Sequence, residues 1–297
     1  MSLEAYRLFC TAVEVGNLTK AAELLNITPS AASHSIRALE RALGVTLLIR
    51  NHTGISPTDY GKTLLPLFST ILRDEERIKE EVAQINHLLK GRVRIGVFES
   101  VCNQWFPTIL RKFSEKYPLV QLQIYQEGYR AIEQMLMDSK IDIGFVALPT
   151  RELFHTTTIY QDPLLCITPP DFRPQNSAFV TAEDLRSENI IISRRGFDRT
   201  TESFLKSNHL ATSTQHDVSL DSSAIALVES GFGVSILPEL ALKCSSQNCS
   251  VYPLHPMEYR TIAIASLKRQ SRTPAAIKLV EEIKLHAESI VQSVEQD

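Results

Sequence analysis

The feature that most constrains this chain is a pair of short helical patterns near its N-terminus, joined by a tight turn. The stretch runs from Asn17 to Leu43 and reads NLTKAAELLNITPSAASHSIRALERAL. Asn17 and Thr28 stand where helix N-caps belong, and Pro29 follows at a first helical position. The second helix buries one apolar face and presents small polar side chains at its start. This geometry suits insertion into the major groove of DNA, so the spacing predicts a helix–turn–helix domain.

The exposed face of the second helix is the expected DNA contact. Downstream, Val45 to Leu48 is typical of a strand and Arg50 to Gly54 of a turn, which together predict a two-stranded wing. Hydroxyl and guanidinium groups can reach base edges and phosphates, and an alanine methyl can contact thymine. The alternative is a three-helix bundle with an ordinary polar face. The predicted DNA-contacting residues are Thr28, Pro29, Ser30, Ala31, Ser33, His34, Arg37, Arg50, Asn51, His52 and Thr53.

Charge and cysteine content indicate the cellular compartment but do not identify a binding partner. The net charge is −3, and the first sixty residues carry five basic and five acidic side chains. Contacts to phosphate must therefore come from the placement of a few charges and from helix N-termini. The five cysteines are scattered and fit no common zinc spacing, which indicates buried thiols in a reducing compartment. With neither a signal peptide nor an apolar run of about 20 residues, we expect a cytoplasmic protein without metal, cofactor or membrane partner.

A long helical pattern begins at Thr58 and ends near Lys90. Its apolar residues alternate in steps of four and three, with Glu75 in the one remaining slot, which is the heptad spacing of a coiled-coil seam. Pairing two such helices would set two recognition helices on successive half-sites of DNA. An amphipathic helix packed on its own domain is the alternative. The predicted dimer seam consists of Leu64, Phe68, Ile71, Ile78, Val82, Ile85 and Leu89.

The remaining two hundred residues alternate between strand and helix patterns, which predicts open α/β sheets. Ligands of such sheets bind beyond the carboxyl ends of the strands. A serine at a helix N-terminus and an arginine facing it favour a small anion or carboxylate as the effector; alternatively, the nearby arginines pair with Glu202 or Asp198 at the surface. The predicted effector-binding residues are Ser100, Val101, Cys102, Gly128, Tyr129, Ala147, Leu148, Ser193, Arg194 and Ser222.

One set of positions in and just after the first sixty residues has the residue types and spacing of a known family: Phe9, Ala21, Ala22, Leu25, Thr28, Pro29, Ser30, Ala31, Ala32, Ser33, Ile36, Leu39, Glu40, Leu43, Gly44, Leu47, Leu48, Arg50, Thr58 and Gly61. Later segments, IGVFES, IDIGFVAL, the Ser193–Gly196 turn and VESGFGVSILP, match the same family more loosely. On these residues the chain resembles the LysR-type transcriptional regulators of bacteria, most strongly in its first sixty residues. Two positions depart from the family, which often has glutamine at Pro29 and a basic residue at Thr53.

The resemblance implies three parts of mixed α+β and α/β fold. Residues 1–60 would form a winged helix–turn–helix, 58–90 a linker and dimerisation helix, and 91–297 an effector domain like periplasmic solute-binding proteins. Lobe 1 would comprise about 91–161 and 269–297, and lobe 2 about 162–268. The chain would cross between lobes near Tyr160–Pro163 and return near Ser266–Arg269.

The implied function is that of a ligand-responsive regulator, an activator or a repressor. It would bind an interrupted palindrome of double-stranded DNA as a homodimer or homotetramer and contact RNA polymerase. An enzyme is the main rival, but the sequence has no GxSxG, HExxH, GxxxxGK[ST] or GxGxxG motif. A stand-alone solute-binding protein would need a secretion signal and would leave the first ninety residues unexplained.

Overall fold

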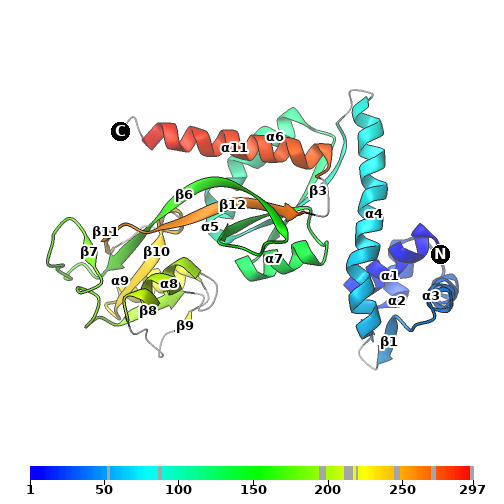
Figure 1. Ribbon diagram of the computed structural model, residues 1–297, viewed down its shortest axis with the longest axis horizontal. Helices are drawn as coiled ribbons and strands as arrows, with labels where there is room; N and C mark the ends of the chain where they lie inside the picture. Colours follow the sequence, from blue (N-terminus) through cyan, green and yellow to red (C-terminus); the bar gives the residue numbers. More distant parts are fainter. Residues whose placement is uncertain are drawn as a thin grey trace.

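The computed structural model describes residues 1–51, 54–85, 89–193, 199–210, 217–218, 220–243, 248–268 and 272–294. A small N-terminal domain and a long helix lie beside a larger α/β domain (Figure 1). Within the described ranges, no helix has both the length and the apolar composition that a bilayer crossing requires.

The N-terminal domain is a three-helix bundle with a two-stranded wing. Side chains of Ser2, Asn17 and Thr28 accept hydrogen bonds from the first turns of the helices they precede. The helices pack around a core that includes Phe9 and Leu39, both at most 2% exposed. The wing strands begin at Leu48, three residues later than the sequence pattern suggests. The elements are α1 (Leu3–Val15), α2 (Leu18–Leu24), α3 (Pro29–Leu43), β1 (Leu48–Asn51) and β2 (Gly54–Pro57).

Helix α4 (Asp59–Ile85) is the long helix. It is capped by Thr58, whose hydroxyl accepts from the Gly61 N–H at 3.0 Å and donates to the Thr46 carbonyl at 2.7 Å. An added Cβ at Gly61 would lie 2.3 Å from the Leu47 carbonyl oxygen, so only glycine permits this close approach. The start of α4 is thus fixed against the wing.

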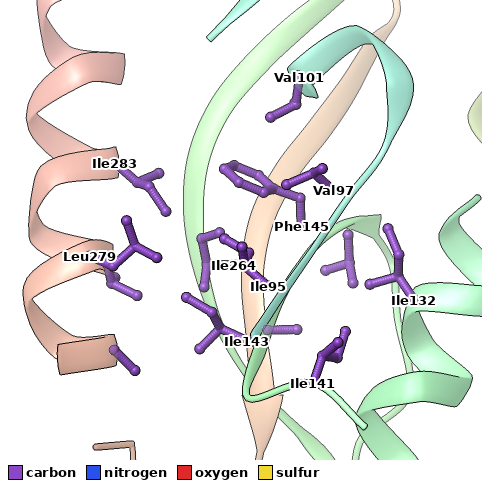
Figure 2. Packing of buried hydrophobic residues seen from close by; sticks show 14 of the residues in the cluster. Ile95, Val97, Val101, Ile132, Ile141, Ile143, Phe145, Ile264, Leu279 and Ile283 are labelled. Carbon is purple, nitrogen blue, oxygen red and sulfur yellow. The ribbon is translucent and has the colours of Figure 1, made fainter. Parts of the chain in front are cut away.

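The larger domain has two lobes, and lobe 1 is built on parallel strands with two antiparallel ones. The strand order is β4-β3-β5-β12-β6, with β3 parallel to β4 and β5, and β12 antiparallel to β5 and β6. Its apolar core joins Ile95, Phe145 and Ile264 of the sheet to Ile132 and Ile283 of the flanking helices (Figure 2). The elements are β3 (Gly91–Val97), α5 (Glu99–Gln104), α6 (Phe106–Lys116), β4 (Val120–Gln126), α7 (Tyr129–Met137), β5 (Ile143–Leu148), β6 (Phe154–Thr168), β12 (Tyr259–Leu267) and α11 (Pro274–Val294).

Lobe 2 continues the same hydrogen-bonded sheet through the second half of β6. Strand β10 is antiparallel to β6 and parallel to β8, and two apolar clusters cover the two faces. The elements are β7 (Val180–Thr181), β8 (Ile190–Ser193), α8 (Arg199–Ser207), β9 (Asp217–Val218), α9 (Asp221–Glu229), β10 (Val234–Pro238), α10 (Glu239–Leu242) and β11 (Ser250–His255).

Strand pairing places the first crossing between the lobes on β6 and the return crossing before β12. On β6, Pro163 pairs with β12 of lobe 1 while Leu164 pairs with β10 of lobe 2. The return crossing lies before Tyr259 rather than at 266–269, because β12 already pairs with β5 and β6, and its Ile262 and Ile264 are fully buried in the lobe 1 core. Residues 259–268 therefore belong to lobe 1.

Candidate DNA-binding surface and effector cleft

Helix α3 presents an exposed face at its N-terminal half. The buried face carries Ala32, Ile36 and Leu39, each at most 4% exposed. The Thr28 hydroxyl accepts from the Ala31 N–H at 3.2 Å and so caps the first turn of the helix. Ser33 is half-buried. The other predicted residues of this helix and its cap are exposed: Thr28, Pro29, Ser30, Ala31, His34 and Arg37.

A shallow groove continues this face toward the wing. His34, Arg37 and Arg41 line it together with the residues that lead into β1. The Glu40 carboxylate accepts from the backbone N–H groups of Leu47, at 2.7 Å, and of Leu48, at 3.3 Å. Glu40 thereby fixes the wing relative to α3, a positioning role that the sequence analysis did not assign.

The wing itself is only partly described. Arg50 pairs with Ile55 and Asn51 with Gly54 in the β1–β2 ladder, which confirms the predicted hairpin. The predicted contacts His52 and Thr53 lie outside the described residues. Backbone anchoring is clear at the wing base, where the Ile55 N–H donates to the Gly16 carbonyl at 2.9 Å. The wing therefore follows α1 and α3 as one unit.

The second polar site lies where the two lobes meet, and its centre is Arg260 at the start of β12. The guanidinium donates from Nη1 to the Tyr129 hydroxyl at 2.6 Å, and from Nη2 to the Ser100 hydroxyl at 3.1 Å. It also pairs with Asp162 on β6, and its plane covers the Phe98 ring at 4.9 Å. The side chains of Arg260 and Asp162 are 3% and 0% exposed. Arg260 thus joins four elements at the junction.

Asp162 also anchors α10 to this centre. Its Oδ1 accepts from the Leu240 N–H at 3.1 Å, in the first turn of α10. Burial raises the pKa of Asp162, and the Arg260 charge opposes that shift. Because the two charges compensate one another, the pair contributes little net charge to the cleft.

The facing wall comes from lobe 2. The Ser193 hydroxyl donates to Asp221 Oδ1 at 2.5 Å, and the hydroxyl of Thr201 and the carboxylate of Glu202 lie beside them. The cavity encloses about 30 Å³, space for one or two water molecules. The cavity is lined by Tyr129, Ile192, Ser193, Thr201, Glu202, Asp221, Ile236, Leu237, Pro238 and Arg260.

Two family models together span nearly the whole chain. The helix–turn–helix domain of the bacterial regulatory lysR family matches residues 3–62, and the LysR substrate-binding domain matches residues 86–288. The chain belongs to the LysR family of bacterial transcriptional regulators. It is a DNA-binding regulator with an effector-binding domain.

Curated relatives of this LysR-family protein align over almost their full length. The probable HTH-type transcriptional regulator LrrA of Synechococcus elongatus is 29% identical over 296 residues, covering 98% of this chain and 99% of the relative. The uncharacterized regulator YvbU of Bacillus subtilis is 27% identical, covering 91% and 94%.

Solved LysR-family structures share the fold. A full-length OxyR of Pseudomonas aeruginosa superposes with a TM-score of 0.79 at 21% identity, covering 96% of this chain and 98% of the other. CbnR in complex with its target DNA gives a TM-score of 0.63 at 19% identity, covering 96% and 100%. At these identities the likeness concerns the fold.

Only some of the predicted effector-binding residues of this LysR-family protein lie at the cavity. Tyr129 and Ser193 line the cavity, and Ser100 reaches it through Arg260. Val101 was wrongly assigned, because its side chain is fully buried in the lobe 1 core (Figure 2). Arg194 lies outside the described residues.

The other predicted effector-binding residues do not line the cavity. Ser222 is exposed on α9, one residue beyond Asp221. Cys102 is half-buried, and burial raises the pKa of its thiol. Gly128 is the N-cap of α7, and Ala147 and Leu148 pair with β12 at the end of β5. The sequence analysis did not name Arg260, Asp162, Thr201 or the residues of β10 as effector-binding residues, and it named Glu202 only as an alternative partner of an arginine.

The residues of the predicted dimer seam on α4 lie in three environments: the core of the DNA-binding domain, the edge of the lobe 1 core and the exposed surface. Leu64 and Phe68 pack in the core of their own DNA-binding domain, and Leu89 packs on the lobe 1 core. Phe68, at 4% exposed, was wrongly assigned to a partner, because its own protomer covers it, whereas Leu64 and Leu89 are only partly covered. Nothing is described of the Ile85 side chain. The remaining predicted residues are exposed and share that exposure with Leu67: Ile71 at 41%, Ile78 at 65%, Val82 at 54% and Leu67 at 47%.

Proposed function

We propose that two protomers bind an interrupted palindrome, each placing the N-terminal half of α3 in the major groove and the wing beside it. The observation that carries this proposal is the exposed face of α3, backed by a fully packed opposite face and continued by the groove at His34, Arg37 and Arg41. Hydroxyls at the helix start suit phosphates and base edges, and arginine suits guanine or phosphate.

The exposed apolar side chains of α4 support a dimer in which two protomers pair along this helix. Leu67, Ile71, Ile78 and Val82 form an exposed apolar stripe along one side of the helix. A twofold axis through this stripe would bury it against its own copy and set two α3 helices on opposite half-sites. Two such dimers would form a tetramer, acting in the cytoplasm and contacting RNA polymerase near its promoter.

The cleft between the lobes is the proposed effector site. Among the described residues that line it, Arg260 is already paired with Asp162, and lobe 2 contributes the carboxylates of Glu202 and Asp221. These groups do not support the earlier preference for a simple anion. They favour a small polar molecule that offers acceptors to Arg260 and Tyr129, and donors to Asp221.

The test compares binding to a duplex from the upstream intergenic region with binding to random DNA at two salt concentrations. A lost base contact costs about 1–3 kcal/mol, or roughly 5- to 150-fold in affinity. We expect Ser30→Ala with Arg37→Ala to lose that much specific affinity and to reduce the salt dependence. Arg111→Ala, which removes an exposed charge from α6 of lobe 1, is the matched control. Unchanged operator affinity in the double variant would contradict the assignment of this face.

A further inference from the structure

A stripe of polar and basic side chains runs along almost the whole length of α3. Its members recur at steps of four, three and four residues, which places them on one side of a helix with about 3.6 residues per turn. All of them are exposed: Ser30, His34, Arg37 and Arg41. Arg41 stands in the last turn of α3, one turn beyond the last DNA contact that the sequence predicted on this helix.

The basic part of this stripe lines the groove between α3 and the wing. The groove has a volume of about 660 Å³, and His34, Arg37 and Arg41 line it together with the residues that connect α3 to β1. An added Cβ at Gly44 would meet no described atom within 4 Å, so the groove is open at the end of α3. Thr46, also exposed, is the last lining residue before the wing.

The charge in this groove is positive. One lining residue is acidic, but the Glu40 carboxylate accepts from the backbone N–H groups of Leu47 and Leu48 and is thereby turned toward the wing. Arg41 Nε donates to the Arg37 carbonyl at 3.4 Å, which leaves its terminal nitrogens for another partner. Within the described part of the chain, neither Arg37 nor Arg41 pairs with a carboxylate.

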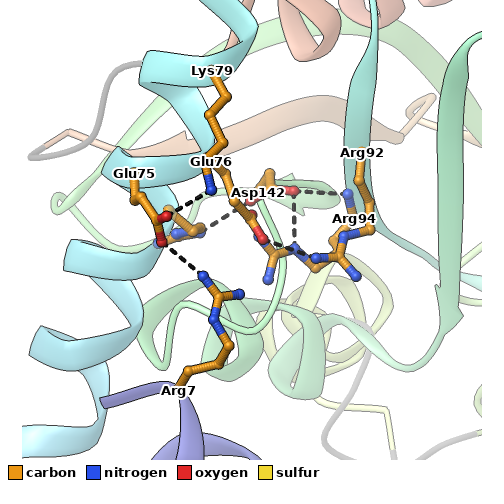
Figure 3. Close-up of polar contacts among 8 residues, drawn as sticks. Arg7, Glu75, Glu76, Lys79, Arg92, Arg94 and Asp142 are labelled. Carbon is orange, nitrogen blue, oxygen red and sulfur yellow. Dashed lines mark hydrogen bonds and ion pairs between the residues drawn. The ribbon is translucent and has the colours of Figure 1, made fainter. Parts of the chain in front are cut away.

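The arginines of β3, by contrast, are paired with an acid (Figure 3). Arg92 and Arg94 bond to the Glu76 carboxylate at 2.8 Å and 3.0 Å. Pairing of this kind compensates the charge within the protein, so such arginines add little to the electrostatic potential at the surface. Arg37 and Arg41 keep their charge for an external anion, and guanidinium groups suit phosphate.

The groove lies where the DNA backbone has to pass. A helix in the major groove and a wing beside the neighbouring minor groove stand on opposite sides of one sugar–phosphate strand, because that strand separates the two grooves. Here α3 and the start of β1 flank the groove, and Glu40 holds them at a fixed separation. A DNA strand between them would bring its phosphates beside Arg37 and Arg41.

We propose that the groove between α3 and the wing is a phosphate track, in which Arg37 and Arg41 each contact a phosphate of that strand. The position of the strand rests on the proposed function, which places α3 in the major groove. Phosphate contacts carry no sequence information directly. The track therefore supplies affinity for any duplex, whereas Ser30 and Ala31 in the first turn of α3 face the bases.

Salt titrations with a random-sequence duplex test the track in the full-length protein. Each lost phosphate contact lowers the slope of log K against log salt concentration by about 0.9 and costs about fivefold in affinity at about 0.15 M salt. We expect Arg41→Ala to lower the slope by that amount for each bound protomer, and Arg37→Ala with Arg41→Ala by twice as much. Arg41→Lys should keep the slope, because an ammonium also binds phosphate. Arg111→Ala on lobe 1 is the control.

A variant that gains affinity removes the ambiguity of misfolding. Thr46→Lys adds a positive charge at an exposed position of the groove. It should raise the slope by about 0.9 for each bound protomer and tighten binding to the random duplex. Ser114→Lys adds the same charge at an exposed position of α6 in lobe 1 and should leave the slope unchanged.

The same variants are then measured on the duplex from the upstream intergenic region. Equal losses on both duplexes, with an unchanged ratio of specific to random affinity, are the expected result. An unchanged slope in folded Arg37→Ala with Arg41→Ala, or no gain for Thr46→Lys, would overturn the track. So would a loss confined to the specific duplex, because it would make these arginines base contacts. The ratio in the parent protein decides the proposed function, and the slope on random DNA decides the track, so each can fail without the other.

Discussion

Replacing Phe68 and Ile78 by alanine, one at a time, separates the folding of a protomer from its dimerisation. Both residues fit the same heptad spacing on α4, yet Phe68 is 4% exposed and Ile78 is 65% exposed. Phe68 stacks on Tyr6 and meets the Phe9 ring edge-on at 5.5 Å. We expect Phe68→Ala to destabilise the DNA-binding domain and Ile78→Ala to weaken the dimer.

The magnitudes follow from burial. Truncating a buried phenylalanine costs about 3–5 kcal/mol, a large share of the roughly 5–15 kcal/mol that stabilises a domain. Ile78→Ala removes three carbons worth about 0.8 kcal/mol each when buried. With about two-thirds of that surface open to a partner, the loss is about 1.5 kcal/mol per protomer. Twofold symmetry doubles it to about 3 kcal/mol, or roughly 100-fold in the dimer dissociation constant.

Sedimentation at a series of concentrations measures the dissociation constant, and amide hydrogen exchange of α1 measures the local opening free energy. Phe68→Ala should reduce the protection of α1 at every concentration, whereas Ile78→Ala should leave α1 protected in the monomer. If Phe68→Ala instead raised the dissociation constant with full protection of α1, Phe68 would belong to the dimer interface and the assignment of the seam would be refuted.

Three further substitutions have defined outcomes. Arg260→Met should lower stability by about 3–5 kcal/mol because it leaves Asp162 charged and buried, and Arg260→Met with Asp162→Leu should recover most of that loss in calorimetry. Burial lowers the pKa of His286, so the unfolded chain binds the proton more readily; stability should fall as the pH drops below about 6.5, and His286→Phe should flatten that dependence. Gly61→Ala should cost about 1–3 kcal/mol by overpacking, because the new methyl meets the Leu47 carbonyl, with a lower melting temperature as the readout.

Local sequence signals predicted the elements of the DNA-binding domain well. Thr28 and Pro29 define the start of α3, and Gly44, with a φ of 71°, ends it as the left-handed C-terminal residue. These signals act within a few residues along the chain, so a sequence shows them directly. The same is true of the strand–helix alternation that predicted the α/β sheets of the larger domain.

Long-range pairing was not predictable in the same way. Arg260 and Asp162 are 98 positions apart, and only the antiparallel pairing of β6 with β12 brings them together. Nothing near Arg260 in the sequence distinguishes it from a surface arginine. The predicted dimer seam differs from the structure for a related reason. Periodicity shows that a helix face is apolar, but it does not show whether α1, lobe 1 or a second protomer covers that face. Phe68 and Leu89 satisfied the period and found partners inside the protomer.

The buried charges restrict where this regulator can change shape. The Arg260–Asp162 pair joins β12 and β6, the two strands at the lobe crossings, and the Leu240 N–H adds the first turn of α10 to the same point. Separating these groups would expose an uncompensated charge to a low-dielectric interior, so the crossings are poor places to bend. On the far side of the cleft, Asp221 and Ser193 bond only to each other across lobe 2 in the contacts described. We therefore expect a ligand to displace that wall, while the crossings keep their buried ion pair and Arg260 stays with Ser100 and Tyr129 on lobe 1.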